Sequence, residues 1–207
     1  MAERAIFLDR DGTLVHVRHY PTRPEQLVLY DNLGQGLRTL QQAGFKLFVI
    51  TNQGGIALGF FGEPELALMH AHLAHELAQL HVRINGFYHC PHHPDGVRAE
   101  LAIACECRKP RPGMLLRAAA EHGIDLARSW FVGDILDDVE AGRRAGCRTV
   151  LVDLGTESPP LSLIRTPHAV ARDTVHALAI IAAAEQIGPD GERYLPPSWQ
   201  RELEVAR

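Results

Sequence analysis

Short apolar runs that alternate with leucine-rich helical stripes constrain the fold of this chain more than any other feature. The runs lie at residues 4–8, 47–50, 86–88, 130–132, 149–152 and 169–171. Short apolar runs bounded by polar or glycine-containing segments are typical of buried strands. Strands that alternate with helices predict a parallel sheet covered by helices on both faces. The sequence therefore predicts an α/β fold of the Rossmann-like type.

Three connecting helices are indicated by the spacing of apolar residues and by the residues at their ends. The first ends at Gly44, the second begins near Pro64, and the third runs from Pro112 to Gly123. Proline is favoured in the first turn of a helix, and glycine commonly follows the last turn. These helices would connect strands that lie side by side.

Composition limits the partners and the location. A chain of 207 residues with 46% hydrophobic residues suits one domain at 1–187, followed by a polar tail at 188–207. The formal net charge of −4 provides no overall basic field, so we expect no nucleic acid as a partner; a compact anionic substrate held by local charges is the alternative. No apolar run reaches the roughly 20 residues that cross a bilayer, and a strand begins where a signal peptide would lie. We expect a cytoplasmic monomer that binds no membrane.

Two carboxylates follow the first expected strand, in the segment FLDRDGTL. Asp9 and Asp11 stand two residues apart, and Gly12 comes next. Like charges about 4 Å apart repel by roughly 4 kcal/mol at an effective dielectric near 20, and a divalent cation reverses this repulsion. With Mg²⁺ bound, Asp9 can act as a nucleophile while Asp11 transfers a proton. The alternative is an ordinary Asp-Gly turn after a strand.

Polar side chains also follow the later strands. Thr51 ends the second run, Arg108 and Lys109 precede the third helix, and Asp134 follows the fourth run. A hydroxyl and an ammonium group can stabilise phosphoryl oxygens, and a carboxylate can bind a metal. The alternative for the two cations is a solvated loop. The alternative for Asp134 is a helix N-cap, unless one of the aspartates at 137–138 caps that helix.

Three cysteines and a histidine occur in two short pairs, within a loop at 90–107. Cys90 and His92 form one pair, and Cys105 and Cys107 form the other. Three thiolates and one imidazole suit a closed, structural zinc site, and His93 is an alternative to His92. The other interpretations are a set of free thiols and a zinc ribbon for nucleic acid. The acidic charge of the chain speaks against the ribbon.

Two other groups have structural interpretations. His70, His72 and His75 accompany the leucine stripe of the second helix, without a cysteine or a carboxylate pair to complete a metal site. We assign these histidines to a solvated face. Cys147 stands alone before a strand, and we expect it to be a small buried hydrophobic residue.

Taken together, the segments FLDRDGTL, TNQGGI, CRKPRPGM and VGDILDD resemble the haloacid dehalogenase superfamily of aspartyl-phosphate phosphatases, over most of residues 5–155. Within it, TNQGGIALG, YHCPHHP and CECRKPRPGML are most similar to the D-glycero-D-manno-heptose 1,7-bisphosphate 7-phosphatases and the related histidinol phosphatases. The resemblance implies Mg²⁺-dependent hydrolysis of a phosphate monoester and a structural Zn²⁺. The 7-phosphate of the heptose bisphosphate is the expected target, and histidinol phosphate is the alternative substrate.

The resemblance also implies a role for each matching residue. Asp9 would attack phosphorus, and Asp11 would protonate the leaving group and then deprotonate water. The implied binding residues are Asp9, the carbonyl of Asp11 and Asp134 for Mg²⁺; Thr51 and Lys109 for the phosphoryl oxygens; Arg18, Tyr20, Asn52 and Arg108 for the substrate; and Cys90, His92, Cys105 and Cys107 for Zn²⁺.

Four positions depart from the pattern of the heptose enzymes. The chain has Val17 where an acidic residue is usual, Gly54 where serine is usual, Leu58 where arginine is frequent and Ile135 where lysine is common. None of them belongs to the reacting groups, so the departures affect recognition of the substrate. Arg18 or Arg108 would then meet a second phosphate. A polynucleotide 3′-phosphatase would need a basic groove, and a zinc protein without activity would have no need of both Asp9 and Asp11.

Overall fold

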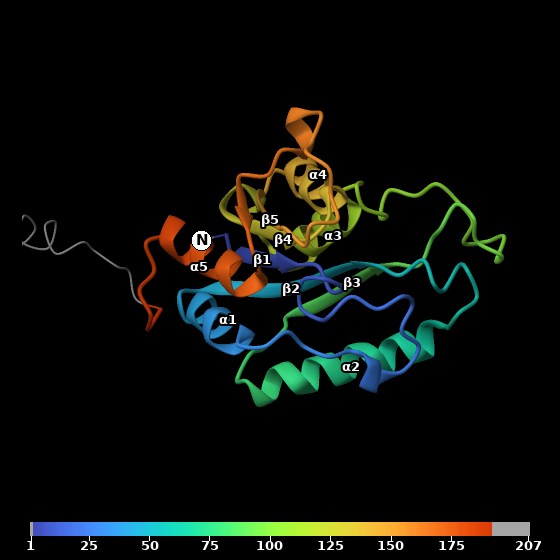
Figure 1. Cartoon of the computed structure of the whole chain (residues 1–207), viewed down its shortest axis with the longest axis horizontal. Coiled ribbons are helices and arrows are strands. Elements are labelled where there is room, and N and C mark those ends of the chain that lie inside the picture. Colours follow the sequence, from blue (N-terminus) through green and yellow to red (C-terminus); the bar gives the residue numbers. More distant parts are fainter. Residues whose placement is uncertain (1, 192–207) are drawn as a thin grey trace, which may run out of the picture.

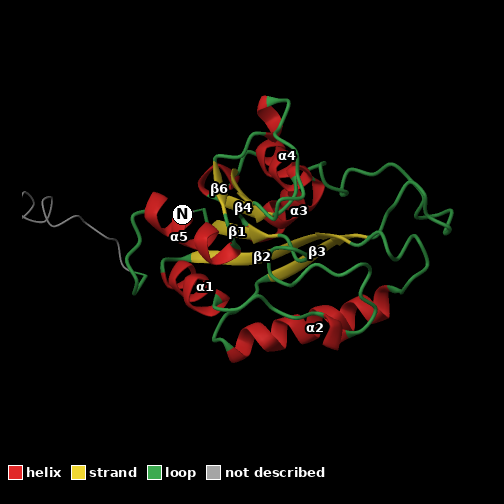
Figure 2. Cartoon of the chain, viewed as in Figure 1, coloured by secondary structure: helices red, strands yellow, loops and turns green. Residues whose placement is uncertain are grey.

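The expected α/β fold is confirmed by a computed structural model, which describes residues 2–191. Its strands are β1 (Arg4–Leu8), β2 (Phe45–Asn52), β3 (Gly86–Cys90), β4 (Trp130–Gly133), β5 (Arg148–Val152) and β6 (Ala169–Ala171). Its helices are α1 (Leu33–Gln42), α2 (Glu63–Gln79), α3 (Gly113–His122), α4 (Leu136–Ala145) and α5 (Thr174–Ala184). All the strands pair in parallel, in the order β3-β2-β1-β4-β5-β6 (Figure 1, Figure 2).

Two apolar cores lie on the two faces of the sheet, as the alternation of side chains along β1 requires. Ile6 and Leu8 point into the core formed with α1, α2 and α5. Ala5 and Phe7 point into the opposite core, which α3 and α4 cover. Figure 1 shows these two helical layers above and below the sheet. Because helices cover both faces, we look for a site at the carboxyl ends of the central strands, where open α/β sheets bind their ligands.

The prediction of a solvated face for the histidines of α2 is wrong for His70. Only 9% of His70 is exposed, and its ring stacks on Phe87 with centroids 4.7 Å apart. His75 is exposed and His72 is half-buried. The physical reason is helical spacing: His70 lies four residues after Leu66 and three before Leu73, so it shares their buried stripe.

Two long loops lie beyond the carboxyl ends of β1 and β3. A bridge between Val15 and Leu29 closes the loop at residues 15–32, and residues 91–111 carry the cysteines. No helix within the described residues is long and apolar enough to cross a membrane. Of the expected tail at 188–207, residues 188–191 contact α1, where Thr39 donates a hydrogen bond to the Pro189 carbonyl. Residues 192–207 lie outside the described residues.

Candidate active site

The carboxyl ends of β1, β2 and β4 bring Asp9, Thr51 and Asp134 to one place, because these strands are neighbours in the sheet. The turn after β1 is tight. Gly12 adopts a φ of +90°, and a Cβ there would lie 2.2 Å from the Asp134 Oδ2. Only glycine combines this left-handed conformation with so close an approach. Gly12 therefore allows the Asp134 carboxylate to approach the turn that carries Asp9.

Lys109 is the centre of the site. Its Nζ lies 2.5 Å from the Asp9 Oδ1, 2.6 Å from the Asp138 Oδ1 and 3.1 Å from the Ile50 carbonyl. The side chain is only 2% exposed. Burial by itself lowers the pKa of Lys109, but the carboxylates of Asp138 and Asp9 outweigh it and raise the pKa above its ordinary value. Lys109 is thus a fixed positive charge beside Asp9.

Asp138 is a site residue that the sequence reasoning missed, since it considered only a capping role for this aspartate. Asp138 does cap α4, where it accepts a hydrogen bond from the Ile135 N–H at 3.3 Å. Its other oxygen is bound to Lys109, and the residue is 1% exposed. A signal was available: Asp138 lies only four residues after Asp134, in the first turn of the helix that follows the same strand.

The carboxylates of Asp9, Asp134 and Asp138 fit a divalent cation. Oxygen atoms of all three lie within 4.8 Å of one another. Burial and the neighbouring carboxylates raise the pKa of Asp134 to about 8. Burial likewise raises the pKa of Asp138 to about 7, although Lys109 opposes the shift. Hard oxygen ligands with excess negative charge are the set that Mg²⁺ prefers, and a cation would restore the ionised forms.

Asp11 turns away from this cluster. Arg10, which is 1% exposed, holds the Asp11 carboxylate through its Nε at 3.0 Å and its second terminal nitrogen at 2.8 Å. Gln53 Nε2 donates to Asp11 Oδ2 at 3.3 Å and to Thr51 Oγ1 at 2.8 Å. Burial raises the pKa of Asp11 although Arg10 lowers it, as suits a group that carries a proton. Sequence reasoning missed Gln53, because a glutamine after a strand has no distinctive pattern.

The Asn52 side chain is engaged by the protein itself. Its Oδ1 accepts a hydrogen bond from the Lys109 N–H at 3.0 Å, and its Nδ2 donates to the Lys109 carbonyl at 3.2 Å. The two bonds make Asn52 a clamp that connects the end of β2 to the backbone of Lys109. Contact between Asn52 and the substrate stays a prediction.

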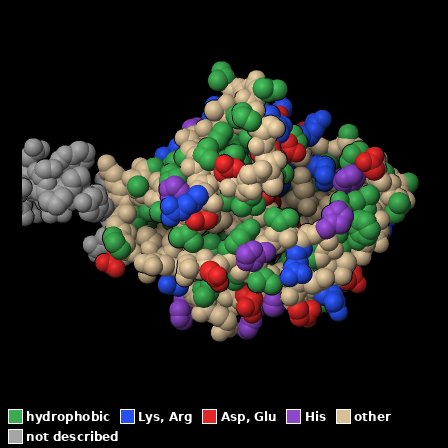
Figure 3. Space-filling model, viewed as in Figure 1, with side chains coloured by type: hydrophobic (Ala, Val, Ile, Leu, Met, Phe, Trp, Pro, Cys, Tyr) green, Lys and Arg blue, Asp and Glu red, His purple; other side chains and the backbone are tan. Residues whose placement is uncertain are grey.

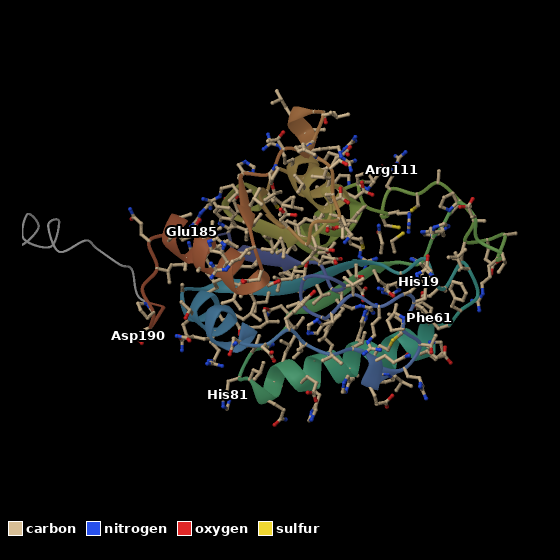
Figure 4. All side chains as sticks on the ribbon, viewed as in Figure 1. His19, Phe61, His81, Arg111, Glu185 and Asp190 are labelled. Atoms are coloured by element: carbon tan, nitrogen blue, oxygen red, sulfur yellow. The ribbon has the colours of Figure 1, made fainter. Side chains whose placement is uncertain are left out.

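Two hollows flank the reacting groups. One, of about 230 Å³, is lined by Arg18, Tyr20 and Asp11, and the other, of about 560 Å³, by Arg108 and Lys109. Figure 3 shows Lys, Arg and His side chains gathered around a depression on this face. In Figure 4 Arg111 lies on the α3 side of the sheet, whereas His19 and Phe61 lie on the α2 side. The substrate can therefore be contacted by loops from both sides.

The loop at residues 90–107, here called the metal loop, brings its four predicted ligands together. The Cys107 Sγ lies 3.2 Å from the Cys90 Sγ, 3.3 Å from the Cys105 Sγ and 3.2 Å from the His92 Nδ1. Tetrahedral zinc with bonds of about 2.3 Å to sulfur sets its ligands about 3.8 Å apart, so small outward movements of these four atoms would accommodate the ion. The neighbouring thiol of Cys90 lowers the pKa of Cys107 to about 5. His93 lies outside the group, against Gly54.

Comparisons with known proteins agree with this geometry. A family model described as HAD-hydrolase-like matches residues 106–177. The D-glycero-beta-D-manno-heptose-1,7-bisphosphate 7-phosphatase of Yersinia pestis is 46% identical over 153 residues, 73% of this chain and 81% of the relative. The D-glycero-alpha-D-manno-heptose-1,7-bisphosphate 7-phosphatase of Photorhabdus laumondii is 34% identical over 175 residues, 84% of this chain and 90% of the relative.

A solved structure is also similar. The D,D-heptose 1,7-bisphosphate phosphatase of B. bronchiseptica, complexed with magnesium and phosphate, superimposes with a TM-score of 0.74 at 30% identity, covering 87% of this chain and 99% of that one. The parallel sheet, with buried carboxylates and a lysine at the ends of its central strands, defines a hydrolase of phosphate monoesters. Given the shared sequence and coverage, the chain belongs to the haloacid dehalogenase-like phosphatases, in the family of these heptose bisphosphate enzymes.

Proposed function

We propose that this enzyme removes the 7-phosphate of D-glycero-D-manno-heptose 1,7-bisphosphate through an aspartyl-phosphate on Asp9. The observation that carries the proposal is the buried ion pair of Lys109 with Asp9, which lies beside a second carboxylate, Asp11, held apart by Arg10. The names of the relatives from Yersinia pestis and Photorhabdus laumondii support the choice of substrate. The greater identity to the beta enzyme favours the beta anomer.

The steps follow from the positions of the side chains. Asp9 attacks phosphorus, and Asp11 donates its proton to the departing sugar oxygen. Asp11 then takes a proton from the water that attacks the phosphorus of the aspartyl-phosphate, which restores Asp9 and releases phosphate. Thr51 Oγ1 and Lys109 Nζ stabilise the charge on the phosphoryl oxygens. Gln53 holds the Thr51 hydroxyl and the Asp11 carboxylate in position, because it donates a hydrogen bond to each.

Asp9, Asp134 and the backbone carbonyl of Asp11 would hold Mg²⁺, with Asp138 as a further carboxylate nearby. When bound, Mg²⁺ supplies positive charge that keeps the carboxylates ionised and balances the charge of the phosphate. Cys90, His92, Cys105 and Cys107 would hold a structural Zn²⁺. Thiol ligands for a metal suit a reducing compartment, which supports a cytoplasmic location.

Arg108 is the better candidate for the second phosphate. Among the described residues no carboxylate forms an ion pair with it, and one of its terminal nitrogens is anchored on the His92 carbonyl at 3.0 Å. Arg18 is exposed and has no hydrogen bond or ion pair within the described part of the chain. An anchored guanidinium loses less freedom when it binds an anion. Arg18 and Tyr20 are then left to contact the sugar.

The test is phosphate release, with Mg²⁺ present, from both anomers of heptose 1,7-bisphosphate, from fructose 1,6-bisphosphate, from histidinol phosphate and from a 3′-phosphorylated oligonucleotide. We expect the highest kcat/KM with a heptose bisphosphate. A higher value with histidinol phosphate would replace the proposed substrate and leave the mechanism unchanged. Equal values with all five would contradict any recognition of the second phosphate.

A further inference from the structure

We propose that Gly54 is a specificity-determining residue, because the absence of its side chain lets the metal loop close onto the site and hold Arg108 over the substrate. This inference goes beyond the proposed function and rests on it, since it concerns the recognition of the second phosphate. Gly54 lies in the segment that follows β2, next to the residues that bind the reacting phosphate. Its partners come from the metal loop, about forty or more positions later in the chain.

A methyl group on Gly54 would fit only if a neighbouring side chain moved. A Cβ at this position would lie 2.9 Å from the His93 Cδ2 and 3.2 Å from a terminal nitrogen of Arg108. Carbon atoms that are not bonded prefer separations of about 3.5 to 4.0 Å. Gly54 is not among the residues with positive φ, so backbone strain does not explain why glycine stands there. The reason is the close approach of the metal loop.

The neighbours of Gly54 are themselves held in place. The His93 N–H donates to the Leu101 carbonyl at 3.2 Å, and the His93 carbonyl accepts from the Gly96 N–H at 3.0 Å. The two bonds fix the backbone at His93. A methyl group on Gly54 would therefore displace side chains, and the guanidinium of Arg108 is the one whose position bears on the substrate.

Arg108 is attached to the metal site at both ends. Its backbone N–H donates to the Cys105 Sγ at 3.3 Å, and its guanidinium donates to the His92 carbonyl at 3.0 Å. The guanidinium nitrogen that touches Gly54 is the one that binds His92. Gly54, Cys105 and His92 thus contact Arg108 at three points and fix its position. A methyl group on Gly54 would push the guanidinium away and break the contact that orients it toward the second phosphate.

The experiment compares the bisphosphate with the matched heptose 7-phosphate, which lacks the second phosphate. For Gly54→Ala we expect kcat/KM with the bisphosphate to fall about tenfold, mainly through KM, as is typical when a hydrogen bond to a charged group is weakened. We expect kcat/KM with the 7-phosphate to stay within about twofold. Zinc content and Tm are measured to establish that the variant is folded. If it is not, Gly54→Ala with His93→Ala replaces it, because the second change relieves the contact with the His93 ring and leaves the contact with Arg108 to be tested.

A double-mutant cycle separates the outcomes. If Gly54 acts through Arg108, adding Gly54→Ala to Arg108→Gln lowers kcat/KM with the bisphosphate no further. A further loss in the double variant, or an equal loss with both substrates in Gly54→Ala, would overturn the inference. A preference for the bisphosphate that is undiminished in Gly54→Ala overturns the inference alone. A wild-type enzyme without any such preference overturns the proposed function as well.

Discussion

The Nζ of Lys109 lies 2.5 Å from the Oδ1 of Asp9, although the two residues are 100 positions apart in the chain. The pair is buried, and the second carboxylate on Lys109 comes from Asp138. An ion pair taken out of water is stable only while both partners are present. Lys109 therefore connects the stability of this protein to the chemistry of its site.

Replacing Lys109 should destabilise the protein. We expect Lys109→Met to lower the free energy of unfolding by about 3 kcal/mol, because Asp9 and Asp138 are left as buried charges without a partner. Added Mg²⁺ should recover more stability in the variant than in the wild type, since the cation can take the place of the lysine charge. Urea denaturation with and without Mg²⁺ measures both effects.

Lys46→Met, at a partly exposed pair with Glu3, is the control and should change stability by no more than about 0.5 kcal/mol. A Lys109→Met protein as stable as the wild type would contradict the charge argument.

Asp9→Asn should abolish turnover without unfolding the protein. An amide cannot attack phosphorus, so we expect kcat to fall by at least about 10⁴-fold. The readout is release of phosphate, with circular dichroism to establish the fold. Asp31→Asn, at an exposed aspartate outside the carboxylate cluster, should keep the wild-type rate. Wild-type turnover by Asp9→Asn would rule out Asp9 as the nucleophile.

Gln53→Leu tests whether Gln53 positions Asp11 and Thr51. The leucine fills a similar volume but cannot donate the hydrogen bonds at 3.3 Å and 2.8 Å. We expect kcat to fall about tenfold with little change in KM, because both bonds orient groups that act in the transition state. Steady-state kinetics separate the two constants. A rise in KM alone would instead indicate that Gln53 binds the substrate.

Cys107→Ser should cost both the bound zinc and stability. Cys107 is the sulfur in contact with all the other predicted ligands, and zinc binding contributes free energy of folding in a loop with few buried apolar residues. Zinc content by atomic emission and Tm are the measurements. The matched control is Cys147→Ser, because Cys147 is buried away from the cluster. Equal zinc content in the two variants would refute the Cys₃His site.

His70 makes stability depend on pH. Burial, with smaller contributions from Arg10 and His89, lowers the pKa of His70 to about 3 in the folded protein. The unfolded chain keeps a pKa near 6.5, so it binds more protons between these values and stability falls as pH falls. The contribution is fully present above about pH 6.5 and decreases by about 1.4 kcal/mol per pH unit below it.

His70→Phe should flatten that dependence, since phenylalanine keeps the stacking on Phe87 but cannot be protonated. Urea denaturation at pH 7.5 and pH 5.5 measures the change in unfolding free energy for each protein. We expect the wild type to lose more stability than the variant over this interval, by about 1.4 kcal/mol. Equal losses of unfolding free energy in both proteins would contradict the burial of His70.

Local patterns in the sequence were sufficient to predict most of the fold and the composition of the site. Apolar runs predicted each strand to within a few residues, since burial on both faces demands continuous hydrophobic sequence. Polar residues directly after those runs had to meet at one edge of a parallel sheet, which placed Asp9, Thr51 and Asp134 together. The paired cysteines likewise indicated a metal site, because the ligands of each pair are close along the chain.

Only the tertiary structure decided which groups face one another across the site. The path of the metal loop sets three of these distances: from Lys109 to Asp138, from Asn52 to the backbone of Lys109, and from Gly54 to Arg108. Loop paths are set by many weak contacts between distant segments, and no short pattern encodes them. The sequence by itself therefore determined the strands and the polar residues that stand at their carboxyl ends. Packing between segments far apart in the chain determined their partners, their burial and their charge state.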